Sequence, residues 1–305
     1  MKKITALLSV ALLAFTLQAA PKKLLVVSTT AGYRHASITN LETMLSQLGK
    51  KSGSFTVDFV RQPPGKPAAP TKVAALPADA TDDAKAAHKL AEEKFTQDQT
   101  AYSAAEAKWE ETLKATLQKL SPDNLKNYDG VVFASTTGEL PIPDRQGFLD
   151  WIKAGHAFIG LHAASDTFHQ WPEYKEMLGA EFIHHGRQVS VDCLNQDPAN
   201  PATASLPQVW HIQQEEIYEF TNYDSAKVHD LLIMDKYPQD KKVTGHFPVS
   251  WCKSYGTGKV FYTSLGHRED LIDVDFTDRY NPIEVSQTYQ AHVLGGIEWA
   301  LRLKK

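Results

Sequence analysis

The sequence has 305 residues, of which 42% are hydrophobic and 22% are charged, enough to bury a core without disulfide or metal cross-links. Lysine and arginine total 32 against 36 acidic residues, which gives a formal net charge of −4. This acidic balance, with no basic cluster that could follow a phosphate backbone, excludes nucleic acid as an expected partner.

The first twenty residues predict a secretory signal peptide. Two lysines precede an apolar stretch from Ile4 to Leu17 that is too short to span a bilayer, and small residues follow at Ala19 and Ala20. Cleavage there leaves a mature chain of residues 21–305 with no stable membrane span. We therefore predict an exported protein, either periplasmic or secreted.

Strand and helix patterns alternate through the first part of the mature chain. LLVVSTT predicts a strand, ITNLETMLSQLG a helix and FTVDFV at 55–60 the next strand. The order resumes with a strand in YDGVVFAS at 128–135, a helix in DRQGFLDWIKAG and a strand in AFIGL. This alternation predicts an α/β fold with a doubly wound, mostly parallel sheet.

Residues 62–120 interrupt the alternation and are predicted to be an insertion. They begin with a proline- and alanine-rich stretch, and a helix rich in lysine, glutamate and alanine is expected over about residues 84–120. Phe95, Tyr102 and Trp109 recur every seven residues, so one face of this helix is expected to pack against another protein surface. That partner is either its own domain, the commoner case, or another protein or second copy of the chain.

The last part of the chain is richer in strand patterns. They are RQVSVDCL, EEIYEF, LLIMD, FPVSWCKSYG and GKVFYTSLG, and a helix is predicted near residues 290–303. The Gly-Thr-Gly turn in SWCKSYGTGKVFYTS predicts a hairpin. Cys193 and Cys252 lie in these apolar segments outside any metal or redox motif, which favours buried free thiols over a disulfide.

Three histidines follow the carboxyl ends of predicted strands, namely His35, His162 and His267. Ligands bind at this edge of open α/β sheets, so we expect the three side chains to face one crevice. His162 stands in a small-residue turn after AFIGL, where many α/β enzymes present a nucleophile. The simpler alternative is that each histidine caps its strand by a hydrogen bond to a loop carbonyl.

Histidines and carboxylates that converge from separate loops can hold a divalent metal, and His162, His185 and His267 are the candidate ligands. No local metal motif such as HExxH supports this. Glu215 and Glu216 alternate along EEIYEF, so only Glu216 is expected to share a face with Tyr218.

Other kinds of site have weaker support. No G-x-S-x-G elbow is present, and the Gly-Thr-Gly turn joins two strands rather than opening a helix, so no dinucleotide fingerprint is present. Trp171 in FHQWPEY is the best candidate for stacking on a sugar ring, although packing in the core is the commoner role of such a residue.

The order of several motifs resembles a known family. These motifs are LLVVSTTAGYRHASI, YDGVVFAS, GLHAASDTF, EEIYEF, PVSWCKSYGTGKVFYTSLGHRED and a closing GGIEWAL. Together they resemble the ThuA-like (trehalose utilisation) family over essentially all of the mature chain except the insertion. The resemblance implies a flavodoxin-like α/β sandwich similar to class I glutamine amidotransferases. Amidotransferases carry their catalytic cysteine at the turn where this chain has His162, so amidotransferase chemistry is not expected.

The resemblance also implies a pocket, whose residues it assigns by motif. The motifs assign His162, His267 and Glu216 as candidate catalytic residues, and Tyr33, His35, His185 and Tyr218 as candidate substrate-binding residues. Asp166 and Trp171 are further substrate-binding candidates, taken from the sequence and not from the resemblance. One departure is that relatives commonly carry His-Pro where this chain has Asn200 and Pro201.

The family is associated with carbohydrate metabolism, and some members are thought to act on keto-sugars. We therefore expect an exported enzyme of glycosides or keto-sugar derivatives. Imidazoles exchange protons beside a carbonyl near neutral pH, and a divalent metal would polarise that carbonyl, which supports elimination, isomerisation or hydrolysis through an enediolate. A pair of glycosidase carboxylates is not evident. The alternative is a module that binds a sugar or a partner without catalysis.

Overall fold

The computed structural model describes residues 20–305, so the predicted signal peptide lies outside the described residues except for Ala20. The described chain forms a nine-stranded sheet in the order β2-β1-β3-β4-β11-β10-β9-β6-β7 and a two-stranded sheet of β5 and β8. Neighbouring strands run parallel from β2 to β11 and antiparallel from β11 to β7.

The parallel half of the sheet is the scaffold of the site. Its strands are β1 (Lys22–Val27), β2 (Phe55–Val60), β3 (Gly130–Ala134), β4 (Ala157–Leu161) and β11 (Gly258–Thr263). Every residue of β3 and β4 is buried, as expected for parallel strands that are covered on both faces.

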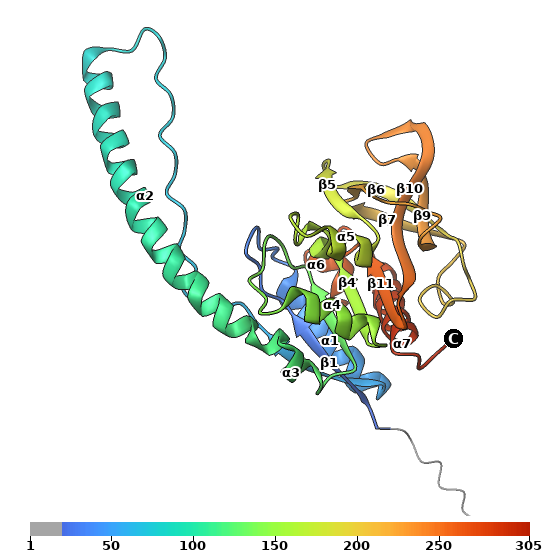
Figure 1. Cartoon of the computed structure of the whole chain (residues 1–305). Helices are drawn as coiled ribbons and strands as arrows, with labels where there is room; N and C mark the ends of the chain where they lie inside the picture. Colours follow the sequence, from blue (N-terminus) through green and yellow to red (C-terminus); the bar gives the residue numbers. More distant parts are fainter. Residues whose placement is uncertain (1–19) are drawn as a thin grey trace, which may run out of the picture.

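The remaining strands form the antiparallel half and the small second sheet. They are β5 (Glu181–His185), β6 (Val189–Asn195), β7 (Val209–Glu215), β8 (Tyr218–Thr221), β9 (His229–Tyr237) and β10 (Asp240–Tyr255). In Figure 1 the amino-terminal end of β10 curls over beside β9. Register shifts along the pair β9–β10 accompany this bend.

Helices cover both faces of the parallel half (Figure 1). One face carries α1 (Ile38–Ser52), α6 (Glu269–Ile272) and α7 (Ile283–Ala300), and the other carries α3 (Pro122–Leu125), α4 (Arg145–Lys153) and α5 (Pro172–Leu178). Leu45 and Ile297 belong to the first core, and Phe148 and Tyr174 belong to the second. The predicted α/β fold is confirmed as a mixed α/β architecture, in which the strands from β2 to β11 along the sheet are parallel.

Some predicted elements differ in their bounds. EEIYEF is not one strand, because β7 ends at Glu215 and β8 begins at Tyr218, with a break at Glu216 and Ile217. The closing helix starts earlier than predicted, at Ile283. The predicted hairpin is present between β10 and β11, where Gly256 adopts a left-handed φ of 60°.

The long helix α2 (Asp82–Leu117) projects away from the body of the molecule in Figure 1, and an extended segment runs beside it. Thr81 caps its start by accepting from the Ala84 amide. Only its carboxyl-terminal end contacts the core, through buried Trp109, Leu113 and Leu117. The predicted helix therefore packs on its own domain at its base, while the rest lies in solvent.

Both cysteines are buried and free, as the sequence favours. Within residues 20–305, none of the helices combines the length and apolar character needed to cross a membrane.

Candidate functional site

The elbow after β4 places His162 at the carboxyl edge of the sheet. His162 has a φ of 48° and an exposed fraction of 0%. The loop after β11 reaches the same place through Gly266, whose φ is 125°. A Cβ added to Gly266 would lie 2.7 Å from the hydroxyl of Tyr289, so only glycine lets the chain bring His267 this close.

Four side chains meet at this edge, each following a different strand. His35, His162, Glu216 and His267 each offer one nitrogen or oxygen, and these atoms all lie within 4.8 Å of one another. The ring centroids of His35 and His162 are 4.7 Å apart, and that of His267 is 5.4 Å from each. The structure thus brings together the three histidines that follow β1, β4 and β11, and it adds Glu216.

The protonation of His162 is set by its hydrogen bonds. Its Nδ1 lies 2.7 Å from the carbonyl oxygen of Ser264, which only accepts, so Nδ1 carries the proton. Its Nε2 therefore has a lone pair, which accepts the hydroxyl of Tyr218 at 3.1 Å. Burial holds the pKa of His162 well below its usual range, and neighbouring histidines lower it further. His162 is neutral, the form that binds a metal.

His35 and His267 differ in their electrostatic surroundings. Burial, together with His267, lowers the pKa of His35 to about 4. Burial also acts to lower the pKa of His267, but Glu216 and Glu215 outweigh it and leave that pKa above the usual value. Nδ1 of His267 lies 3.2 Å from Oε1 of Glu216 without hydrogen-bond alignment.

The cluster fits a divalent transition metal. Nδ1 of His35 and Nδ1 of His267 are buried and have no hydrogen-bond partner among the described residues. Three imidazoles and one carboxylate are a donor set suited to zinc and its neighbours. Such ligands stand about 2 Å from the metal and hence up to about 4 Å apart, so small side-chain rotations bring these four atoms into range.

His185 extends the site on its open side. Its Nδ1 lies 3.0 Å from Oε2 of Glu216 and 2.9 Å from the carbonyl oxygen of Gly186. Both partners are acceptors, so Nδ1 carries the proton and Nε2 keeps a lone pair. His185 is half-exposed, unlike the four clustered residues, and it is not part of the group of four that could hold a metal.

The other sequence candidates lie at different depths. Tyr33 is 67% exposed, and its ring meets that of His35 edge-on at 4.8 Å, so it forms the rim of the site. Asp166 is partly buried, with its carboxylate 2.7 Å from Nε2 of His169. Trp171 is only 6% exposed and packs on Phe168, so it presents little ring surface to a sugar.

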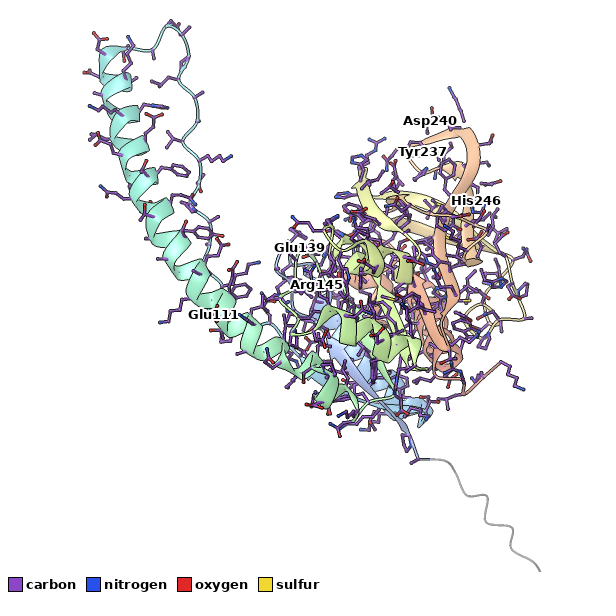
Figure 2. All side chains as sticks on the ribbon, in the orientation of Figure 1. Glu111, Glu139, Arg145, Tyr237, Asp240 and His246 are labelled. Atoms are coloured by element: carbon purple, nitrogen blue, oxygen red, sulfur yellow. The ribbon has the colours of Figure 1, made fainter. Side chains whose placement is uncertain are left out.

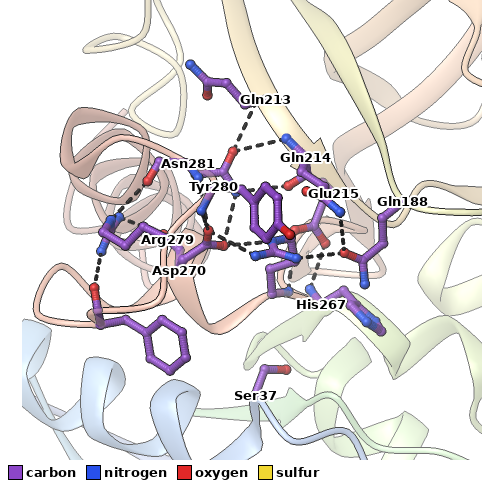
Figure 3. Close-up of polar contacts among 12 residues, drawn as sticks. Ser37, Gln188, Gln213, Gln214, Glu215, His267, Asp270, Arg279, Tyr280 and Asn281 are labelled. Atoms are coloured by element: carbon purple, nitrogen blue, oxygen red, sulfur yellow. Dashed lines mark hydrogen bonds and ion pairs between the residues drawn. The ribbon is translucent and has the colours of Figure 1, made fainter.

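A buried polar network supports the loop that carries His267 (Figure 3). Glu215, with an exposed fraction of 0%, accepts the backbone N–H groups of His267 at 2.8 Å and Arg268 at 3.4 Å. Burial raises the pKa of Glu215 to about 7, although His267 opposes the shift. Arg268 in turn pairs with Asp270 at 2.8 Å and donates to Gln188 at 2.8 Å.

Sequence reasoning did not find several of these supporting residues. Ser264 contributes a backbone carbonyl, which no residue type signals. Gln188 and Asn281 are polar residues outside any motif, and they reach the loop from just before β6 and just before α7. Their supporting role becomes evident only in the folded structure, where Gln188 contacts Arg268 and Asn281 contacts Asp270.

Residues 79–300 match the family model ThuA, described as trehalose utilisation. The chain belongs to the ThuA family. The matched range begins within residues 62–120 and includes α2, while the motif with Tyr33 and His35 lies before it. No curated protein matches this ThuA chain significantly.

Two solved structures resemble this ThuA protein. A ThuA-like protein from Parabacteroides merdae has 19% identity and a TM-score of 0.62, with 93% of this chain and 91% of that chain covered. A ThuA-like protein from Bacteroides uniformis has 18% identity and a TM-score of 0.57, with 93% of each chain covered. At these identities the likeness shows a shared fold.

Proposed function

We propose that this ThuA protein is an exported, divalent-metal-dependent enzyme that removes a proton from the carbon beside the carbonyl of a keto-sugar. The observation that carries the proposal is the set of four donor atoms from His35, His162, Glu216 and His267, all within 4.8 Å. Buried polar atoms without hydrogen-bond partners cost free energy, and in the described chain Nδ1 of both His35 and His267 is such an atom, which is why the cluster favours a ligand site over packing.

The metal would be held by these four side chains and would polarise the substrate carbonyl. His162 is fixed for this role by Ser264, because the hydrogen bond to Nδ1 leaves Nε2 as the ligand atom. Glu216 supplies the negative charge. The Glu215 carboxylate keeps the backbone of His267 in place.

His185 is the group we assign to proton removal. It is half-exposed beside the cluster. Its Nδ1–H is donated to the carbonyl oxygen of Gly186 at 2.9 Å, with Oε2 of Glu216 3.0 Å from the same nitrogen, so Nε2 is the atom that accepts a proton. Positive charge that develops on the ring is stabilised by the same Glu216 carboxylate. Burial, with the nearby carboxylates, raises the pKa of Tyr218 well above the usual value, so its hydroxyl remains a donor that can return a proton or orient a substrate oxygen.

The substrate class rests on two supports. The family model carries the description trehalose utilisation, which points to carbohydrate. Tyr33 offers an exposed ring at the rim, where a sugar can stack.

The parallel strand order β2-β1-β3-β4-β11 supports the flavodoxin-like arrangement, in which ligands bind at this edge. The step after proton removal decides whether the product arises by elimination, isomerisation or hydrolysis.

Proton removal is testable without knowledge of the final product. A 3-keto-glucoside is incubated in deuterium oxide with the mature protein and Zn²⁺ or Mn²⁺, and proton NMR follows the loss of signal from the hydrogens beside the carbonyl. The wild type is expected to exchange these hydrogens, while His162→Ala and His185→Gln should slow the exchange at least about 100-fold. The matched control is His211→Ala, which removes an exposed histidine paired with Asp192.

Equal exchange by His162→Ala and wild type, each above a protein-free control, would contradict the assignment. Binding of the keto-sugar without exchange in any sample would instead favour a sugar-binding module.

A further inference from the structure

A cavity lies beside β8, the strand that begins with Tyr218. It has a volume of about 460 Å³ and is enclosed by β8, the end of β9 and the curled part of β10. Tyr218 lines this cavity and also donates to His162, so this residue contacts both the cavity and the histidine cluster. Figure 2 shows Tyr237 and His246 at the end of β9 and the curled part of β10.

The walls of the cavity are mainly aromatic. Phe220, Tyr223, Tyr237 and Phe247 are all half-buried, so part of each ring remains open to a ligand. Tyr237 and Phe247 lie 5.6 Å apart at an interplanar angle of 48°, which makes a corner rather than a closed stack. Flat apolar rings around a space of this size are suited to the C–H face of a small ring.

The hydroxyl ends of the two tyrosine rings are already fixed by hydrogen bonds. The hydroxyl of Tyr237 donates to Glu219 at 2.6 Å, and that of Tyr223 donates to Asp230. Asp230 also lies 3.1 Å from Nε2 of His246. Rings that are held by hydrogen bonds at their hydroxyl ends lose little freedom when a ligand binds, which favours affinity.

The charges of the cavity select against anions. Its lining contains neither lysine nor arginine in the described chain, so a phosphate or carboxylate would find no positive partner there. The carboxylates of Glu219 and Asp230 already accept hydrogen bonds from the two tyrosine hydroxyls. Hydroxyl groups, which donate and accept, match such edges best.

We infer that this cavity is a binding subsite for a neutral sugar ring, which stacks on Tyr237 and Phe247 and places hydroxyls near Glu219 and His246. Sugar binding here stands on the cavity alone. Its use for a second ring of the substrate, next to the ring held at the histidine cluster, rests on the proposed function.

The test is calorimetric titration of metal-free protein with methyl α-D-glucopyranoside and with trehalose, and with glucose 6-phosphate and choline as charged probes. Wild type is expected to bind the neutral sugars more tightly than either charged probe. Tyr237→Leu and Phe247→Leu should weaken sugar binding about tenfold or more, while Tyr237→Phe, which keeps the ring, should stay within about twofold. Circular dichroism of each variant checks that it is folded.

Three results would overturn the inference: no binding of a neutral pyranoside by wild type, tighter binding of choline or glucose 6-phosphate, or unchanged sugar affinity in both ring-loss variants. His162→Ala separates the two proposals, because it should lose proton exchange and keep sugar binding in the cavity. Sugar binding by a wild type that shows no proton exchange would remove the proposed function and leave the subsite standing.

Discussion

Tyr218 donates its hydroxyl to Nε2 of His162 across 3.1 Å, so the ligand atom of the elbow histidine is occupied by a neighbour when no metal is bound. A metal at the cluster must displace this hydroxyl. Because this hydrogen bond must be broken, its free energy opposes metal binding and lowers the affinity for metal.

Tyr218→Phe should for this reason bind Zn²⁺ more tightly than wild type. A neutral hydrogen bond contributes about 0.5–1.5 kcal/mol net, which corresponds to an affinity about 2- to 12-fold higher. Isothermal titration of metal-free protein measures the change. Tyr237→Phe, whose hydroxyl bonds Glu219 outside the cluster, should leave the affinity unchanged. Weaker metal binding by Tyr218→Phe would show that the hydroxyl supports the site instead.

Glu215→Ala should destabilise the fold. The substitution leaves the buried N–H groups of His267 and Arg268 without their acceptor, which costs about 1–3 kcal/mol in the free energy of unfolding. Urea denaturation gives this value. Glu219→Ala is the matched control, because Glu219 is half-exposed and its side chain accepts from Tyr237 at 2.6 Å. Equal destabilisation by the two variants would mean that the Glu215 contacts stabilise the fold no more than the half-exposed hydrogen bond of Glu219 does.

His292 predicts a pH dependence that is separate from the site. It is completely buried and lies between the carbonyl oxygen of Ala202 at 2.8 Å and the hydroxyl of Ser250 at 3.1 Å. Burial lowers its pKa to about 4. An unfolded histidine has a pKa of about 6.5, so between these values the unfolded state binds more protons and stability is lost as the pH falls.

Wild type should therefore lose about 2 kcal/mol relative to His292→Gln between pH 7 and pH 5. Urea denaturation of both proteins at the two pH values measures the difference. A constant difference would show that the folded protein accommodates a charged His292.

The projecting part of α2 should be dispensable for folding. Trp109 of α2 donates to the carbonyl oxygen of Pro63 at 3.3 Å. The helix therefore meets the extended segment that precedes it at the point where both leave the body of the molecule. Replacing residues 68–106 with a short Gly-Ser linker keeps Trp109 and the buried leucines after it. The variant should melt within a few degrees of wild type, and failure to fold would contradict this.

We propose that the solvent-exposed part of α2 associates with a second copy of the chain. Sedimentation of the same variant tests this: wild type would then sediment as a larger assembly than the variant, whereas two monomers would leave this part of α2 without that role.

The sequence predicts the parallel half of the fold well, because its strands are continuous apolar runs such as AFIGL that have few alternatives to burial. It also predicts that residues after strands share one edge, which is how His35, His162 and His267 come together. The break at Glu216 and Ile217, between β7 and β8, has no local signal. It depends on β8 leaving the main sheet to pair with β5.

Other features depend on contacts between distant residues. Trp171 is followed by a helix that turns its ring into the core, where Phe168 and Tyr174 surround it. The sequence alone could not distinguish this from an exposed loop. Likewise, Gln188 approaches Arg268 across 80 positions of sequence, and no periodicity connects the two.

The proposed metal site is tested most directly by the metal content of the mature protein, measured by inductively coupled plasma mass spectrometry after purification without chelators or a histidine tag. Wild type, His162→Ala, His267→Ala and the control His211→Ala are compared after incubation with divalent ions and desalting. We predict near-stoichiometric metal in wild type and His211→Ala, and its loss in the other two variants. Wild type without metal, or full metal in both His162→Ala and His267→Ala, would contradict the proposal.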